Sequence, residues 1–311
     1  MVVWGLCLSL TSPVYGGLAS AAPTRTSTSS APGIGDLYAR PSPLVEATAS
    51  APIFQRGEPL IWFWPHFDTT DYVITGAAAA IGGASYALQL SSGRRASVLL
   101  DDQARDQLRL PRLNQRFLAR DVSDVLLSLM TAYPILVDAL VISWWHRASP
   151  EAAAEMVLID AQAVALTVAL QGMSAALVGR ERPYGDACGN ELPEATRDCE
   201  GYNRYRSFFS GHTALSFTVA GLVCSHHANL PINGDPISDL VPCVGALAAA
   251  TAVGTLRMAG DMHYLSDVLV GAAIGALSGF GVPWLFHYRH ELELEVRLVP
   301  TPSGLAVTGV F

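Results

Sequence analysis

The sequence predicts an all-α fold, a bundle of six transmembrane helices followed by a small C-terminal β-hairpin. The 311-residue chain is 50% hydrophobic and only 15% charged, whereas soluble domains contain roughly 25% charged residues. Six apolar segments rich in Ala and Gly each approach the roughly 20 residues that cross a bilayer. A soluble all-α bundle is the alternative, but so many apolar segments in so weakly charged a chain are hard to bury. The six segments are residues 72–90, 122–145, 152–178, 212–230, 241–258 and 266–286.

The region before these segments has the composition of a targeting sequence followed by a linker. Residues 1–21 predict a signal peptide, because a short apolar run ends at Pro13 and an Ala-Ser-Ala cleavage pattern follows at residues 19–21. The positively charged start of most signal peptides is missing. Residues 22–59 are rich in Ala, Ser, Thr and Pro and predict a disordered linker. The membrane domain is expected to span residues 60–290.

Polar residues interrupt or follow the apolar segments in three places. Residues 91–121 carry seven arginines interleaved with aspartates, which predicts a polar loop with one amphipathic helix. Asp138 and Asp160 fall inside predicted spans and should face the bundle interior, where they either hold helices together or serve a function. At the C-terminus, residues 291–311 alternate apolar and polar side chains around a Pro- and Gly-containing turn, which predicts a β-hairpin.

The charge composition excludes one class of partner. The formal net charge is −8, and all 19 basic residues are arginines, so the chain contains no lysine. Nucleic-acid binders normally present a basic face. We therefore expect no nucleic-acid partner.

The most informative stretch joins the last two apolar segments. Arg257 ends one segment, and His263 and Asp267 open the next. Residues four apart share one face of a helix. A carboxylate there can hold one imidazole nitrogen and leave the other as a nucleophile or base. An acidic first helical turn explains Asp267 equally well without chemistry.

Two further polar clusters lie at predicted helix ends. Arg182 follows the third segment, and Ser210, Gly211 and His212 open the fourth. If the spans alternate in direction, these clusters and the 257–267 stretch meet at one face of the membrane. Guanidinium groups can bond two phosphoryl oxygens in a fixed fork, and a glycine lets helix N-terminal amides approach an anion.

Together these residue types indicate phosphoryl transfer. Two histidines permit a division of labour, in which one attacks phosphorus and the other protonates the leaving oxygen. No Cys, His or Glu grouping has the spacing of metal ligands. We therefore expect chemistry that needs neither a metal nor another cofactor.

The three clusters resemble the type 2 phosphatidic acid phosphatase superfamily, which includes the vanadium haloperoxidases. That family's pattern is Lys-x6-Arg-Pro, then Pro-Ser-Gly-His, then Ser-Arg-x5-His-x3-Asp. The resemblance implies that His263 is the nucleophile forming a phosphohistidine, that Asp267 orients it, and that His212 is the general acid. It also implies a phosphate cradle made of Arg182, Arg257, Ser210 and the Gly211 amide.

The sequence departs from the family pattern at three positions. Phe209 replaces the proline of the second motif and Leu256 replaces the serine of the third. Ala175 stands where the family has its phosphate-binding lysine. Because Arg180 would point away if the helix continued, we expect Arg204 and Arg206 to supply the missing charge as a positive clamp.

The predicted function is hydrolysis of lipid phosphate or diphosphate esters. Membrane lipids are expected to surround the protein. A membrane-embedded site favours a substrate with an acyl or prenyl tail. One alternative is a lipid phosphotransferase on the same scaffold. Another is a catalytically silent membrane relative with a binding role. A haloperoxidase would give no reason for membrane spans.

The predicted location is the bacterial inner membrane, as a multi-pass protein. A disulfide between Cys188 and Cys199, in the loop before Ser210, would place the catalytic face outside the cytoplasm. Cleavage of the signal peptide and the family resemblance also favour a periplasmic face. The arginine-rich loop at residues 91–121 falls on the same side and predicts the opposite orientation, because basic loops are enriched in the cytoplasm.

Overall fold

The computed structural model describes residues 57–88, 97–193, 196–288, 295–301 and 304–310. The predicted signal peptide and all of the predicted linker before residue 57 lie outside the described residues.

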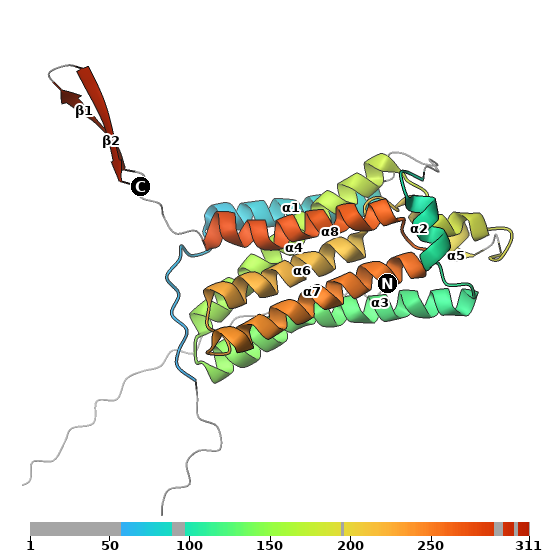
Figure 1. Cartoon of the computed structure of the whole chain (residues 1–311), viewed down its shortest axis with the longest axis horizontal. Helices are drawn as coiled ribbons and strands as arrows, with labels where there is room; N and C mark the ends of the chain where they lie inside the picture. Colours follow the sequence, from blue (N-terminus) through green and yellow to red (C-terminus); the bar gives the residue numbers. More distant parts are fainter. Residues whose placement is uncertain (1–56, 89–96, 194–195, 289–294, 302–303, 311) are drawn as a thin grey trace, which may run out of the picture. The chain divides into compact units, whose positions relative to one another are not determined.

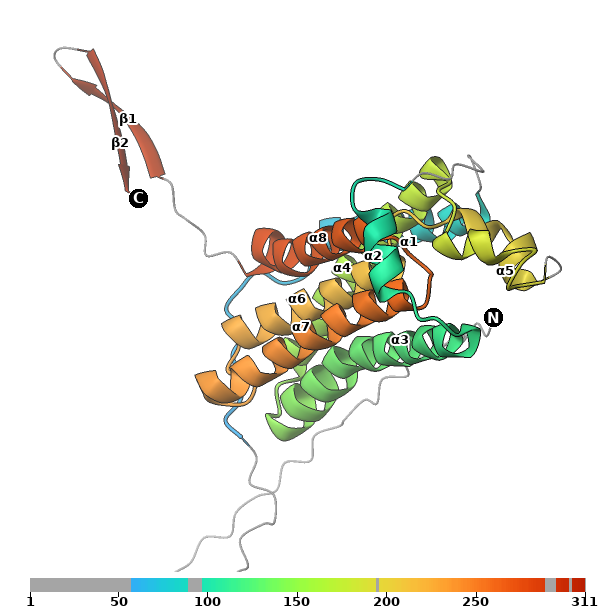
Figure 2. The same cartoon turned by 45° about the vertical axis from the view of Figure 1, so that its right-hand side comes forward.

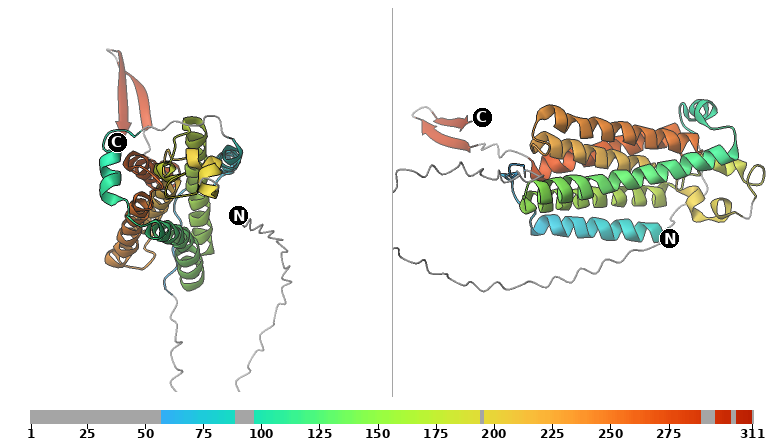
Figure 3. Two further views of the ribbon diagram at one scale, coloured as in Figure 1. Left: turned by 90° about the vertical axis from the view of Figure 1, so that its right-hand side faces the viewer. Right: turned by 90° about the horizontal axis from the view of Figure 1, so that it is seen from below.

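Long helices running side by side in alternating directions dominate the described part of the chain (Figures 1 and 3). Their starts are marked in the sequence: the Asp68 side chain accepts from the first turn of α1, the Asp235 side chain does so in α7, and prolines open α4 and α7. The helices are α1 (Thr69–Ala87), α3 (Leu113–Tyr133) continued by the π-helical η1 (Pro134–His146), α4 (Pro150–Val178), α6 (Gly211–Asn229), α7 (Pro236–Ala259), and α8 (Leu265–Val282) continued by η4 (Pro283–His287).

The all-α prediction is confirmed for the bundle, whereas six spans are not confirmed, because four helices in the described part of the chain are long and apolar enough to cross a membrane. Among the described residues, the helices long and apolar enough to cross a membrane are Leu113–His146, Pro150–Val178, Pro236–Ala259 and Leu265–His287. The helices α1 and α6 do not meet that standard. The reason is clear for α6, which lies between α3, α4, α7 and α8 and carries buried Ser, Thr and His side chains instead of a lipid-facing apolar surface.

A stripe of glycines on α8 brings it close to α6. A Cβ atom added at Gly271 would lie 2.7 Å from the Ser210 carbonyl oxygen. One added at Gly275 or Gly279 would collide with a carbonyl of α6 one or two turns further along. Real Cβ atoms do not approach so closely, so only glycine fits at these positions. The stripe therefore sets the distance between α6 and α8.

One end of the bundle carries the shorter helices and the loops between them (Figure 2). The predicted amphipathic helix of the arginine-rich region is α2 (Asp101–Leu108). The segment between α4 and α6 contains η2 (Pro183–Ala187), α5 (Arg197–Glu200) and η3 (Tyr202–Tyr205). This end is called the polar cap below.

The aspartates predicted to face the bundle interior do so. Asp138 is fully buried and lies 3.4 Å from Nε2 of His227. Asp160 is buried and accepts a hydrogen bond at 2.9 Å from Nε2 of His226. Both histidines belong to α6, so these pairs join the central helix to α4 and η1 within the part of the chain that the structure describes.

The C-terminal part contains two strands, β1 (Glu295–Thr301) and β2 (Gly304–Val310). They pair antiparallel, with Glu295 opposite Val310 and Thr301 opposite Gly304.

Candidate active site

The three motif clusters all lie at the polar cap, because the helices alternate as the sequence predicts. The helix α4 ends at Val178, where Gly179 adopts a left-handed conformation with φ 60°. The chain then turns and carries Arg182 back over the bundle end. His212 lies in the first turn of α6, and His263 lies in the turn between α7 and α8.

His263 is held in the neutral form that a nucleophile needs. Its Nδ1 lies 2.8 Å from the Ser207 carbonyl oxygen, and because a carbonyl only accepts, Nδ1 carries the proton and donates. Nε2 is left with its lone pair and faces Nη1 of Arg182 at 3.5 Å. Burial of the ring and the nearby positive charge of Arg182 lower the pKa of His263 to about 3. The ring therefore remains unprotonated at neutral pH.

Asp267 acts on His263 through Ser207 rather than by a direct hydrogen bond. Its nearer oxygen lies 3.8 Å from Nδ1 of His263, beyond hydrogen-bond distance. That same oxygen accepts from the Ser207 hydroxyl at 2.6 Å and from the Tyr264 amide at 3.0 Å. Ser207 thus connects the carboxylate to the histidine, a role that no sequence motif indicated.

His212 and Arg257 are joined by Asp124, an acidic residue that the family motifs do not include. Asp124, on α3, accepts a bond at 2.6 Å from Nη2 of Arg257. The same oxygen lies 2.9 Å from Nε2 of His212. Asp124 lies near the start of a predicted span, where a carboxylate is unusual. This position could have identified it as a candidate functional residue from the sequence.

Ser210 and Gly211 occupy the helix start as predicted. The Ser210 hydroxyl is fully buried and lies 2.8 Å from the Thr213 hydroxyl and 3.4 Å from the Thr213 amide, so it caps α6. A Cβ at Gly211 would lie 3.1 Å from the Gln171 side chain. The small residue therefore fits a narrow space at the first position of α6.

Arg204 and Arg206 do not form the positive clamp that the sequence predicts. The Arg204 guanidinium pairs with Glu181, with its Nε at 2.7 Å from the carboxylate. Arg206 is buried and donates to the carbonyls of Ser85 and Leu88 at the end of α1, each at 3.2 Å. The exposed carbonyls of a helix C-terminus attract a cation, and this attraction holds the Arg206 guanidinium at the end of α1.

The prediction for Arg180 also fails for a physical reason. It assumed a continuing helix, but the left-handed Gly179 ends α4 one residue earlier. Arg180 is buried and donates at 2.6 Å to Asp267 and at 2.6 Å to Asp101 of α2. It therefore holds the carboxylate behind His263 in place.

The turn that carries His263 is fastened to α2 and α3 by Asp261. This fully buried residue has φ 62°, and its carboxylate accepts from Nε of Arg105 at 2.7 Å and Nε of Arg109 at 2.9 Å. Asp101 accepts in addition from the amide of Ser266 at 2.8 Å. Much of the arginine-rich region is thus paired locally with carboxylates.

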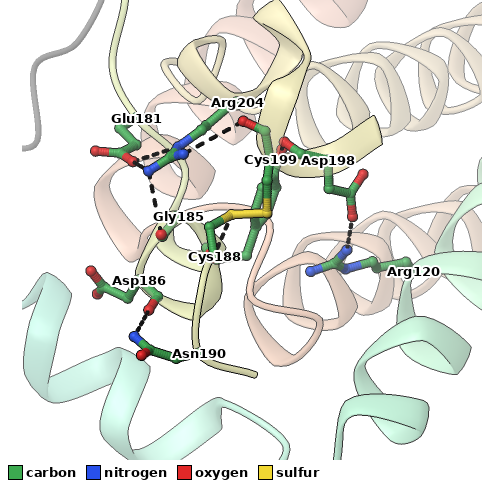
Figure 4. Close-up of a disulfide and its surroundings, with 10 residues drawn as sticks. Arg120, Glu181, Gly185, Asp186, Cys188, Asn190, Asp198, Cys199 and Arg204 are labelled. Atoms are coloured by element: carbon green, nitrogen blue, oxygen red, sulfur yellow. Dashed lines mark hydrogen bonds and ion pairs between the residues drawn. A yellow bond between two sulfur atoms is a disulfide. The ribbon is translucent and has the colours of Figure 1, made fainter. Parts of the chain in front are cut away.

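A disulfide bridges the segment between α4 and α6 (Figure 4). Cys188 and Cys199 are bonded, as the sequence suggested, and Asp198 beside them pairs with Arg120 of α3 at 2.9 Å. A second disulfide joins Cys224 of α6 to Cys243 of α7. That bond was not predicted, because its cysteines lie within apolar segments and carry no loop signal.

Comparison with known proteins identifies the family. The PAP2 superfamily profile matches residues 157–291, a range that contains all three motif clusters. This part of the chain belongs to the PAP2 superfamily. The solved crystal structure of Aquifex aeolicus LpxE is 22% identical, with a TM-score of 0.40, and the match covers 60% of this chain and 96% of LpxE. No curated protein matches the chain.

The PAP2 region begins within α4 and ends just after η4, so it includes α6, α7 and α8. It excludes α1, α2 and α3. Asp101 and Asp124, which contact the polar side chains of the site, therefore come from outside the PAP2 region.

Proposed function

We propose that the protein is a membrane phosphatase that hydrolyses lipid phosphate or diphosphate esters without a metal, through a phosphohistidine at His263. Membership of the PAP2 superfamily supports phosphatase activity. The observation that carries the mechanism is the unprotonated Nε2 of His263, which faces the Arg182 guanidinium at 3.5 Å. A nucleophilic nitrogen beside a forked cation suits attack on a phosphoryl group whose oxygens the cation holds.

The reaction would take two displacements. In the first, the Nε2 lone pair of His263 attacks phosphorus, the bond from phosphorus to the lipid oxygen breaks, and His212 gives a proton to that oxygen. In the second, water attacks the phosphohistidine, His212 takes a proton from the water, and phosphate leaves as the bond to Nε2 breaks. Arg182 and Arg257 would neutralise the charge on the phosphoryl oxygens in both steps.

The lipid nature of the substrate is inferred from where the site lies. His263 and Arg257 stand at the ends of α7 and α8, both of which are apolar enough to cross a membrane. A phosphate bound there would be near the membrane surface, and its acyl or prenyl tail would remain in the lipid.

We further propose that the polar cap faces the periplasm from the bacterial inner membrane. The disulfide between Cys188 and Cys199 supports an oxidising compartment on this side. The arginines of residues 91–121 favour the opposite orientation, and their pairing with carboxylates such as Asp261 does not remove that argument, because the positive-inside rule counts basic residues only.

The test is to assay purified protein in detergent against lipid phosphates and diphosphates, and to measure inorganic phosphate release. Phosphate release by the wild-type protein and its loss in His263→Ala is the expected result. A parallel reaction containing a lipid alcohol would reveal transfer of the phosphoryl-bearing group to that acceptor. Transfer without phosphate release would show that the protein is a phosphotransferase and not a hydrolase. The absence of both activities across the panel would contradict the proposed function.

A further inference from the structure

Arg120 lies on α3 at the polar cap, one helical turn before Asp124. Residues four apart share a helix face, and Asp124 already contacts both Arg257 and His212. Arg120 is itself buried, with 7% of its surface exposed. Its side chain therefore lies on the same side of α3 as the proposed site.

Two contacts fix the direction of the Arg120 guanidinium. Nε donates at 2.7 Å to the carbonyl of Gly260, three residues before His263, and Nη1 donates to Asp198 at 2.9 Å. The guanidinium also lies over the ring of Tyr184, with its carbon 5.1 Å from the ring centre. Tyr184 is two residues beyond Arg182, so the cation is held between the two chain segments that carry Arg182 and His263.

The third nitrogen of this guanidinium has no hydrogen-bond partner among the described residues. Nη2 of Arg120 is buried, and within the described residues it makes no hydrogen bond. A buried donor without a partner is costly, and its presence calls for an explanation such as a ligand. Nη2 is therefore a donor available to a bound anion.

Other observations also indicate an anion at this place. Within the described part of the chain, the hydrogen bonds of Arg182 reach carbonyls, a thioether and His263, and none reaches a carboxylate. Burial and, in addition, the positive charge of Arg120 lower the pKa of Arg182. Cations that repel one another in a partly buried site are stabilised when a multiply charged anion binds between them.

The other arginines near the cap are used elsewhere. Arg105 and Arg109 are bound to Asp261. Arg204 is bound to Glu181, and Arg206 to the end of α1. Arg116 of α3 also has buried nitrogens without a hydrogen-bond partner in the described part of the chain, Nε and Nη1, but its guanidinium is paired with Glu191 and lies beside Asp261. Arg120 differs because its guanidinium is held between the segments that carry Arg182 and His263.

We propose that Arg120 is a phosphate-binding residue and supplies the cation that Ala175 cannot provide. The inference rests on the proposed function, because the anion is taken to be the phosphoryl group of the substrate. Nη2 of Arg120 would donate to one phosphoryl oxygen while Arg182 and Arg257 hold the others. The charge would thus come from α3, outside the PAP2 region, in place of a lysine on α4.

The test compares Arg120→Met, Arg120→Lys and Asp198→Asn in the full-length protein purified in detergent. Each variant is measured for kcat and KM, for competitive inhibition by inorganic phosphate, and for thermal stabilisation by inorganic phosphate without substrate. Asp198→Asn is the matched control, because it removes the ion pair with Arg120 but keeps the proposed phosphate ligand. Melting temperatures without phosphate report whether each variant folds.

If the inference is correct, Arg120→Met lowers kcat/KM by about 10²-fold, the usual effect of losing one transition-state contact. It also weakens the stabilisation by phosphate, because only Arg182 and Arg257 remain to hold the anion. Arg120→Lys keeps kcat/KM within about tenfold of wild type, because lysine retains the positive charge but lacks the forked hydrogen-bonding geometry of the guanidinium. Asp198→Asn retains wild-type inhibition by phosphate or strengthens it.

Two results in the variants would overturn the inference. One is unchanged phosphate inhibition and stabilisation in Arg120→Met. The other is an equal loss in Asp198→Asn and Arg120→Met, since the ion pair alone would then account for the effect. If the wild-type protein binds phosphate but hydrolyses none of the esters, the proposed function fails, and the phosphate measurements still decide the role of Arg120. A wild-type protein that does not bind phosphate contradicts both proposals.

Discussion

Nε2 of His212 lies 2.9 Å from the carboxylate of Asp124, and that same carboxylate oxygen accepts a hydrogen bond from Arg257. The proposed general acid and a proposed phosphate ligand therefore share one anionic partner. A phosphate group entering the site would need the same two donors. Asp124 thus competes with phosphate for Arg257 and His212, and it has to yield when substrate binds.

Asp124→Asn should consequently tighten phosphate binding. The variant removes a negative charge near the phosphate, and two unit charges about 4 Å apart repel by about 1 kcal/mol even in bulk water. We expect inhibition by inorganic phosphate to strengthen by about fivefold, while kcat on alkyl phosphates falls because His212 loses its partner. Inhibition kinetics on wild type and Asp124→Asn provide the measurement. Weaker inhibition in the variant would show that Asp124 helps to hold phosphate.

The loss of turnover should depend on the leaving group in His212→Ala but not in His263→Ala. His263→Ala should reduce turnover by at least about 10⁴-fold on every substrate, because the nucleophile is gone. His212→Ala should cost about 10²-fold to 10⁴-fold on alkyl phosphates but much less on an aryl phosphate, whose leaving oxygen needs no proton. Rates on matched alkyl and aryl esters test this difference. Equal losses on both esters in His212→Ala would remove the general-acid role.

The low pKa of His263 predicts that its reactivity persists in mild acid. A histidine is nucleophilic when neutral, and the folded-state pKa of about 3 means that His263 loses its lone pair to a proton only as the pH approaches that value. An imidazole of ordinary pKa would lose about 30-fold of its neutral form at pH 5. We expect burst labelling by an aryl phosphate to change by no more than about twofold between pH 7 and pH 5. A fall of about 30-fold in burst labelling, as for an imidazole of ordinary pKa, would contradict a buried His263 that stays neutral.

Asp261 should be important for stability. Asp261→Ala leaves Arg105 and Arg109 without their central carboxylate, and breaking a buried ion pair costs about 3–5 kcal/mol. We expect a lower melting temperature in detergent, together with reduced turnover, because the same turn carries His263. Asp106→Asn, an exposed position on α2, is the control. Equal melting temperatures for Asp261→Ala and Asp106→Asn would show that the arginine cluster does not stabilise the fold.

The orientation can be tested at the loop disulfide. In a Cys7→Ser, Cys199→Ser background, Cys188 becomes a free thiol in the polar cap. A maleimide that cannot cross the inner membrane should label Cys188 in intact cells if the cap faces the periplasm. In the parent protein, labelling of Cys188 should require a reductant. Labelling only after the inner membrane is permeabilised would place the cap in the cytoplasm.

The sequence was sufficient to predict the helix order and the meeting of the motif clusters, because apolar length and alternation of direction determine both. It was not sufficient to assign the individual arginines. Arg206 and Arg120 both lie close to motif residues in space. Arg206 donates to carbonyls at the end of α1, whereas Arg120 donates to the Gly260 carbonyl, which directs its guanidinium toward the site. Such choices depend on tertiary contacts that sequence spacing does not reveal.

Three other differences between prediction and structure also have local causes. Arg180 was misplaced because a single left-handed glycine, Gly179, ends α4 before it. The helix α6 is less apolar than a typical span because several of its Ser, Thr and His side chains are buried among neighbouring helices, so its sequence alone does not confirm it as a span. Asp124 was missed because it lies in a segment that the family motifs do not include.

The glycine stripe of α8 makes the chemistry sensitive to mutations far along the chain. Gly275 lies eight residues beyond Asp267, about 12 Å along the helix axis, yet a methyl group there would collide with the Ala214 carbonyl of α6. The only relief is for α8 to move away from α6, and this movement would separate Asp267 from His212. Loss of activity in natural variants at such positions would therefore resemble active-site damage, although every polar residue of the site is intact.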